Sequence, residues 1–179
     1  MNKKILIAAI SLLSINVQAA HFGIYQHGAG AIDQTRYVSY RGQVSGISST
    51  HYLCTDTHAR KVPGRITSGV SCEVEWQGDE YSNKQYLMLL DQNYTWVRLT
   101  TSNKEFIMER GVTPGVVDDG NFVYHCKITF INGNTVAGKY VPSQDGCFYG
   151  WYGDGKYHRV SDNSALLEVL TNIPYTGFP

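Results

Sequence analysis

The chain lacks several features that mark common functional classes. Its 15 basic and 15 acidic residues cancel to a formal net charge of zero, so it has no electrostatic footprint for nucleic acid. It contains no phosphate-binding loop, no Gly-x-Ser-x-Gly motif and no Cys-x-x-Cys pair. Beyond the N-terminal segment, no apolar run reaches the roughly 20 residues that a membrane-spanning helix needs. We therefore expect no nucleic-acid partner, no membrane span, no cofactor and no bound metal.

The first twenty residues are the one strongly apolar part of the chain. Lys3 and Lys4 precede an apolar run from Ile5 to Ile15, and Val17-Gln18-Ala19 provides the small-residue pattern of a cleavage site. These features predict a signal peptide over residues 1–19. Residues 20–179 are then a single mature domain, long enough to build its own core, and the protein is expected to be secreted or periplasmic.

Short runs of alternating polar and apolar residues dominate the mature chain. Examples are 36–40, 94–99 and 122–128, each bounded by glycine, asparagine, aspartate or serine. This pattern, together with 13 tyrosines and 18 glycines, predicts an all-β fold. The best helix candidate is Ser164–Leu170, which also reads as a strand.

An internal repeat is the strongest signal in the sequence. When Cys54 is set against Cys126, "CEVEWQGDE" at 72–80 aligns with "CFYGWYGDG" at 147–155. Both segments place Trp, one residue, Gly and Asp at the same distances from a cysteine. We predict two antiparallel β repeats, at about 25–93 and 94–170, that are related by a pseudo-twofold axis and share one core.

The four cysteines fit two interpretations. An exported chain favours disulfides, and the repeat favours the same bond in each copy, Cys54–Cys72 and Cys126–Cys147. A cysteine metal site is the alternative, although the spacing lacks a typical ligand pair.

A glycine followed by a basic residue also occurs in both copies, as Gly64-Arg65 and Gly138-Lys139. Each glycine marks a tight turn or a close backbone approach. Each basic side chain is either a solvated surface charge or a donor to the hydroxyl or carboxylate groups of a ligand.

The aromatic residues near the second cysteine of each copy have two expected roles. Trp76 and Trp151 are expected to pack in the core, because a tryptophan before a Gly-Asp turn is often partly buried. Tyr149, Tyr152 and Tyr157 are expected to reach solvent, where Tyr149 or Tyr152 could cover the apolar face of a sugar.

A family resemblance follows from these motifs. Residues 94–170 contain, in order, "YTWVRL", "GVTPGVVDDGNFVYHCK", "GNTVAGKYVPSQDGCFYGWYGDGKYH" and "LLEVL". This order resembles the DM-nine repeat family of lectin-like proteins, and residues 37–90 match it more loosely. The resemblance implies tandem antiparallel repeats, mannose-type glycan partners and frequent homodimers.

The resemblance also implies particular ligand-binding residues. In the second copy these are Asp119, with Asp118 beside it, and Lys139. This chain departs from the family pattern by Ala137 in place of a proline and by Arg65 in place of the first lysine. Arg65 would suit an acidic sugar, or the first copy would serve as scaffold alone.

Three functional hypotheses remain at this stage. The first is a secreted, non-catalytic carbohydrate-binding protein. The second is a structural or protein-interaction component of an envelope or matrix, or a toxin accessory. The third is an enzyme, either a hydrolase using Asp118, Asp119 or Asp154 or a copper oxidase using His21.

Overall fold

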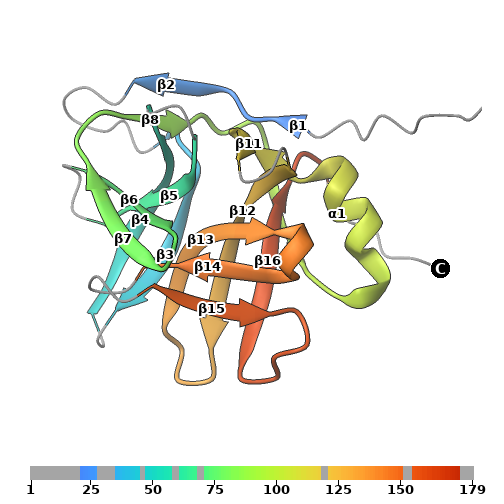
Figure 1. Cartoon of the computed structure of the whole chain (residues 1–179). Helices are drawn as coiled ribbons and strands as arrows, with labels where there is room; N and C mark the ends of the chain where they lie inside the picture. Colours follow the sequence, from blue (N-terminus) through green and yellow to red (C-terminus); the bar gives the residue numbers. More distant parts are fainter. Residues whose placement is uncertain are drawn as a thin grey trace, which may run out of the picture.

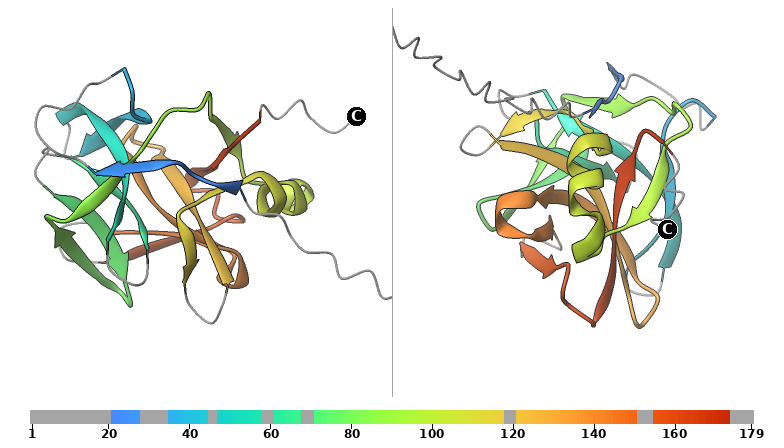
Figure 2. Two further views of the ribbon diagram at one scale, coloured as in Figure 1. Left: turned by 90° about the horizontal axis from the view of Figure 1, so that it is seen from above. Right: turned by 90° about the vertical axis from the view of Figure 1, so that its right-hand side faces the viewer.

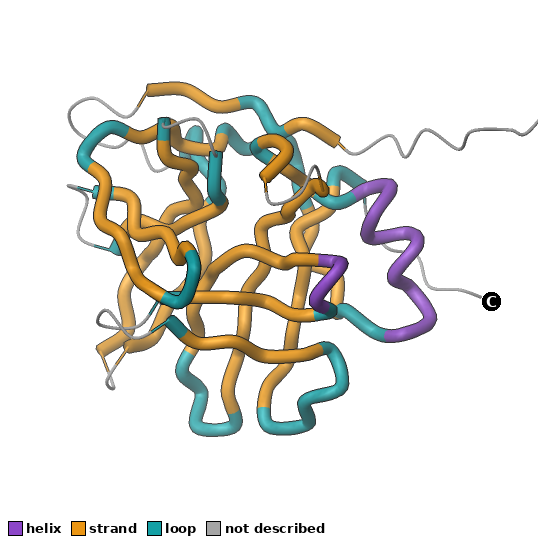
Figure 3. Tube along the Cα trace, viewed as in Figure 1, coloured by secondary structure: helices purple, strands orange, loops and turns teal. Residues whose placement is uncertain are grey.

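The computed structural model describes residues 21–27, 35–44, 47–57, 61–67, 71–117, 121–150 and 155–173. The predicted signal peptide lies outside the described residues and stays a prediction. Within the described part, strands make up most of the chain, which confirms the all-β prediction (Figures 1 and 3).

The first half of the chain forms the left side of the molecule in Figure 1. Its strands are β2 (Tyr25–His27), β3 (Ser39–Val44), β4 (Ile47–Asp56), β5 (Pro63–Ile66), β6 (Cys72–Trp76), β7 (Asp79–Asn83) and β8 (Tyr86–Leu89). The second half contributes β9 (Thr95–Arg98), β11 (Gly115–Val117), β12 (Asn121–Phe130), β13 (Thr135–Val141), β14 (Gly146–Tyr149), β15 (Lys156–Arg159) and β16 (Ala165–Thr171).

Strand pairing is the same in the two halves. The long strand β4 pairs antiparallel with β3, β5 and β8, and β12 pairs in the same way with β11, β13 and β16. The register also repeats, because Cys54 faces Gly64 just as Cys126 faces Gly138. We call the two halves repeat one (β2–β8) and repeat two (β9–β16).

The disulfides follow the repeat. Cys54 bonds to Cys72 and Cys126 bonds to Cys147, so each bridge links the long strand to the second strand beyond it in sequence. Both predicted pairings are confirmed. The alternative of a cysteine metal site is wrong, because the four cysteines are paired in these two disulfides and none is free.

Apolar side chains form three clusters: one within repeat two, one mainly in repeat one that also includes Val123 and Val141, and a third between the repeats. The third cluster joins Leu53 and Leu89 of repeat one to Val112, Ala137 and Leu170 of repeat two. Strands β1 (His21–Phe22) and β10 (Val112–Thr113) add a parallel pairing across the same boundary. Figure 2 shows β1 and β2 crossing from one half of the molecule to the other. The halves therefore share a core.

Of the two interpretations of Ser164–Leu170, the strand is confirmed. The segment corresponds to strand β16 (Ala165–Thr171), in which Leu167 and the last three residues are buried. The α-helix of the described chain is α1 (Lys104–Arg110), which follows the 3₁₀ turn at Thr101–Asn103. Its sequence, KEFIMER, consists mostly of good helix formers, but seven residues are too few for a helical period to stand out.

The repeated glycines mark close strand contacts. Gly64 and Gly138 lie inside β5 and β13, so the turn interpretation is wrong for both. A methyl group placed on Gly138 would come within 1.9 Å of the backbone oxygen of Phe148. The strands β13 and β14 approach too closely here for any side chain.

We expect Gly138→Ala to lower the free energy of unfolding by at least about 1–3 kcal/mol, the usual cost of overpacking. Denaturant unfolding of the oxidised protein measures this change. The control is Gly115→Ala, whose methyl group would first meet the flexible Lys61 side chain at 3.2 Å. Equal effects of the two substitutions would contradict the steric explanation.

A buried histidine ties the N-terminal strand to repeat two. The hydroxyl of Tyr25 on β2 lies 2.7 Å from Nε2 of His125 on β12, and His125 is fully buried. Burial lowers the pKa of His125 from its ordinary 6.5 to about 3. The folded protein therefore keeps this ring neutral over a pH range in which the unfolded chain protonates it.

This difference predicts a loss of stability in acid. Because the folded pKa lies below the unfolded value, the contribution is complete above pH 6.5 and declines as the pH falls toward 3. Between pH 7 and 4.5 the loss from this group is about 2–3 kcal/mol, at 1.36 kcal/mol per pH unit. Urea unfolding at both pH values should show a smaller pH dependence for His125→Gln than for the wild type. An unchanged pH dependence in the variant would exclude His125 as the source.

Candidate binding site

Arg65 lies at the boundary between the repeats and is only 5% exposed. Its Nη2 donates to Glu80 Oε1 at 2.9 Å and lies 3.2 Å from Glu73 Oε2, both in repeat one. The same guanidinium donates to the backbone oxygens of Ala137 at 3.3 Å and Gly150 at 2.8 Å, both in repeat two. Arg65 therefore fastens the two repeats together.

Lys139 makes the reciprocal connection from repeat two. Lys139 is buried, and its Nζ lies 3.1 Å from Glu75 Oε2 in repeat one. The ammonium also lies 4.6 Å from the ring centroid of Trp76 and 5.7 Å from that of Phe148. Reciprocal contacts of this kind are what a twofold relation between the repeats requires. Neither Arg65 nor Lys139 is a solvated surface charge, so that interpretation is wrong for both.

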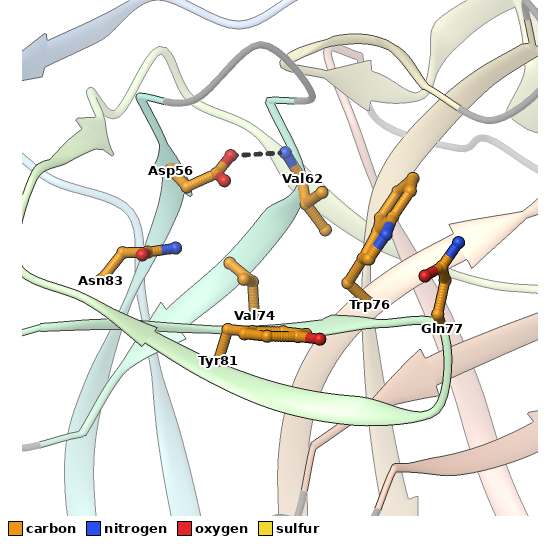
Figure 4. A pocket seen from close by; sticks show the side chains of 7 residues that line it. All are labelled: Asp56, Val62, Val74, Trp76, Gln77, Tyr81 and Asn83. Carbon is orange, nitrogen blue, oxygen red and sulfur yellow. Dashed lines mark hydrogen bonds between the residues drawn. The ribbon is translucent and has the colours of Figure 1, made fainter.

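A pocket of about 370 Å³ opens beside Trp76 in repeat one (Figure 4). It lies between the end of β4, the start of β5 and the hairpin β6–β7. The residues that line it are Asp56, Val62, Val74, Trp76, Gln77, Tyr81 and Asn83. We call this space the repeat-one pocket. Its volume falls in the range of small-ligand sites.

The walls of the repeat-one pocket combine apolar and polar groups. Val62 and Val74 are buried, and Asp56 holds its position by accepting a hydrogen bond from the Val62 backbone N–H at 3.0 Å. Figure 4 shows Asp56 and Asn83 on one side of the pocket and Trp76 on the other. Carboxylate and carboxamide groups opposite an aromatic ring can bind hydroxyls and an apolar face at the same time.

Repeat two contributes to this pocket indirectly. Trp76 lines the pocket and also lies under the ammonium of Lys139, which Glu75 neutralises. A cation above an indole ring is attracted to the face of the ring, so Lys139 helps to fix the orientation of Trp76. Lys139 is thus a positioning residue for the pocket in this geometry.

The structure places Tyr149 differently from the prediction. Tyr149 is 5% exposed, and its ring lies 5.8 Å from those of Phe130 and His158, measured between centroids. The expectation that Tyr149 reaches solvent is wrong, because core side chains pack around the ring. Its role against a sugar stays a prediction. Tyr157 is half-buried, and its hydroxyl donates to the backbone oxygen of Gln144.

Other predicted residues lie outside the described part of the chain. They are Asp118, Asp119, Trp151, Tyr152 and Asp154. Their proposed roles stay predictions. Trp76 packs partly buried against the core cluster of repeat one, as expected.

Sequence reasoning missed three residues of the repeat-one pocket, Asp56, Tyr81 and Asn83. A signal for one of them was present in the repeat itself. The shared register places Asp56 opposite Tyr86 just as Ile128 lies opposite Leu167 in repeat two. A carboxylate where the other copy has a core isoleucine is unusual, and it would have pointed to this end of β4.

A chain of hydrogen bonds in repeat one has the connectivity of a nucleophile and its base. Ser49 Oγ lies 2.8 Å from His51 Nε2, and His51 Nδ1 lies 3.1 Å from the Tyr40 hydroxyl. The Tyr40 hydroxyl accepts a hydrogen bond from the Ala137 backbone N–H at 3.0 Å. The hydroxyl therefore donates its own proton to His51 Nδ1. With this assignment Nε2 carries the imidazole proton and donates to Ser49.

The same histidine is also a poor proton acceptor. Burial, with a smaller contribution from the Arg65 charge, lowers the pKa of His51 to about 4. An imidazole that already donates to the serine cannot remove its proton. The geometry therefore gives Ser49 no activating base.

The described residues contain neither a cluster that could hold a metal ion nor a helix that could cross a membrane. No group of three or more histidine, cysteine, aspartate or glutamate side chains in this part could hold a metal ion. No helix there is long and apolar enough to cross a membrane.

Comparisons with known proteins agree with the fold. A sequence model of the DM9 (DM-nine) repeat matches residues 45–158, which is more than half of the chain. No curated protein matches at a significant level. Among solved structures, the nematode sperm cell motility protein MFP2B is similar, with a TM-score of 0.62 and 16% identity. The similarity covers 86% of this chain but 48% of that protein, so this chain spans about half its length.

Proposed function

We propose, from the premise that this chain belongs to the DM9 repeat family, that it is a non-catalytic carbohydrate-binding protein that acts outside the cytoplasm. The repeat-one pocket carries the proposal, because it combines Trp76 with Asp56 and Asn83 around a space of about 370 Å³. The two disulfides support the location, since such bonds persist in oxidising compartments.

The chemistry of the pocket suits a sugar ring. A carboxylate accepts hydrogen bonds from hydroxyl groups, and bonds to a charged acceptor are roughly twice as strong as neutral ones. The carboxamide of Asn83 can donate and accept, and the indole of Trp76 offers an apolar face. We expect weak affinity for a single monosaccharide, so useful binding would depend on several contacts at once.

The proposed ligands are mannose-type glycans, in keeping with the family resemblance. The resemblance also gives Asp119 and Lys139 direct roles in holding the sugar, and these roles stay proposals. The contacts of Lys139 favour an indirect role in binding, because its ammonium is buried between Glu75 and Trp76.

A glycan array tests the proposed function. The oxidised mature protein should bind mannose-containing glycans, and soluble mannan should compete. Mass spectrometry of the recovered glycans should show intact glycosidic bonds, as expected of a non-catalytic protein. No binding to any glycan, or cleaved products, would rule the proposal out.

A second candidate function is protein interaction. The exposure of Ile131, at 85%, in the turn between β12 and β13 favours it, because this large apolar side chain is available to a partner. Under this hypothesis Ile131→Ser would abolish a protein contact and leave any glycan binding unchanged, which a pull-down and the array would show together.

A further inference from the structure

The two repeats differ at the position of the repeat-one pocket. The shared register aligns the strands of both halves residue by residue. Val74 faces Tyr81 on the hairpin β6–β7, and Tyr149 faces Lys156 on the hairpin β14–β15. Cys72 likewise faces Asn83, as Cys147 faces His158. Tyr149 is therefore the counterpart of Val74, and His158 is the counterpart of Asn83.

In repeat two, larger side chains occupy the corresponding space. The rings of Tyr149 and His158 are stacked with centroids 5.8 Å apart. Phe130 packs edge-on against both, at 5.8 Å from Tyr149 and 5.0 Å from His158. Where repeat one has a valine and an asparagine beside a pocket, repeat two has two stacked rings in its own core cluster.

The Asp56 carboxylate of the pocket has no counterpart in repeat two. Asp56 corresponds to Ile128, which is fully buried in the repeat-two cluster with Tyr149. His158 turns its Nδ1 to Asp162, 2.8 Å from Oδ2. Among the described residues, the counterpart of the pocket thus holds larger rings and lacks the carboxylate, while the counterparts of Trp76 and Gln77, at positions 151 and 152, lie outside the described part of the chain.

We infer that saccharide binding at this position is confined to repeat one, with one site of this kind per chain. This inference rests on the proposed function. The small side chains of Val74 and Asn83 keep the pocket open, and the rings of Tyr149 and His158 close its counterpart. The duplication has left one repeat as the binding half and the other as support, with Lys139 of repeat two holding Trp76 in place.

Titration calorimetry with a mannose trisaccharide tests the inference. The wild-type chain should bind one trisaccharide per chain. A matched pair of substitutions at equivalent positions separates the repeats. Tyr81→Ala should weaken binding at least tenfold, because Tyr81 is 46% exposed and lines the pocket. Lys156→Ala, its counterpart in repeat two, should leave the affinity unchanged.

A second variant closes the pocket in the way repeat two is closed. The double substitution Val74→Tyr, Asn83→His should abolish binding, and its near-ultraviolet circular dichroism and unfolding transition show whether the fold persists. If that variant does not fold, Tyr81→Ala decides alone.

The outcomes separate the two proposals. A wild-type protein that binds no glycan defeats the proposed function. A wild type that binds, but with two sites per chain, or with equal losses in Tyr81→Ala and Lys156→Ala, defeats this inference and leaves the proposed function standing. Undiminished binding by a folded Val74→Tyr, Asn83→His protein does the same.

Discussion

Replacing Lys139 with alanine is expected to lower the free energy of unfolding by about 3–5 kcal/mol, the usual cost of breaking a buried ion pair. Lys139 Nζ lies 3.1 Å from Glu75 Oε2, and the two side chains are 5% and 3% exposed. Without the ammonium, the Glu75 carboxylate loses a neutralising partner in a place that water does not reach. The Trp76 indole also loses the cation above its ring.

Chemical denaturation of the oxidised wild type and variant measures this effect. The matched control is Lys104→Ala, which removes an ammonium 2.6 Å from Asp145 Oδ1 in a pair whose side chains are 32% and 37% exposed. Exposed pairs contribute about 0–1 kcal/mol, so the control should be nearly neutral. If both lysines cost the same, Lys139 does not act as a buried connection between the repeats.

Binding measurements can separate an indirect role of Lys139 from direct contact with the ligand. Lys139→Met keeps most of the apolar stem under Trp76 but removes the charge. If Lys139 only positions Trp76, a folded Lys139→Met protein should keep its binding stoichiometry and lose no more than about tenfold in affinity, roughly 1.4 kcal/mol. A complete loss of binding would instead support the direct ligand role that the family resemblance implies.

The second large effect concerns the disulfides. Replacing Cys126 and Cys147 with alanine should lower the free energy of unfolding by about 3 kcal/mol, because the bridge closes a loop with a sequence separation of 21. In the chain-entropy description, the bridge stabilises the fold by restricting the unfolded chain. Because the effect arises in the unfolded chain, we expect this loss of stability although all four bonded cysteines are fully buried in the folded protein.

The other bridge serves as the comparison. Cys54 and Cys72 are separated by 18 residues, so their replacement should cost nearly the same. Thermal unfolding of the two double variants, with the fully reduced wild type as reference, measures both. A loss confined to one repeat would contradict the entropic account and would show that packing around that bridge dominates.

The repeat made much of the fold predictable. Two cysteines at the same place in each copy favoured the pairing that the structure confirms, since equivalent residues in a duplicated fold make equivalent contacts. Alternating residues predicted strands, because a strand that covers a core turns every second side chain toward it. The helix at Lys104–Arg110 was not predicted, because seven residues span less than two full turns and show no helical period.

Burial of the charged and aromatic site residues could not be predicted in the same way. Arg65 and Lys139 follow glycines inside strands, and a local pattern cannot tell whether another part of the chain covers them. The answer came from residues far away in sequence, because Arg65 reaches Gly150 and Lys139 reaches Glu75. Tyr149 was misjudged for the same reason, as Phe130 and His158 approach it from other strands.

By itself, the sequence determined the β class, the duplication and the family to which the chain belongs, and it favoured the disulfide pairing that the structure has. These properties depend on spacing along the chain. The tertiary structure alone decided that the repeated basic residues connect the halves, and that a pocket is open beside Trp76 where the equivalent described positions of repeat two hold the stacked rings of Tyr149 and His158. Those outcomes depend on which side chains meet across strands, and on whether a valine or a tyrosine stands where the two repeats are otherwise alike.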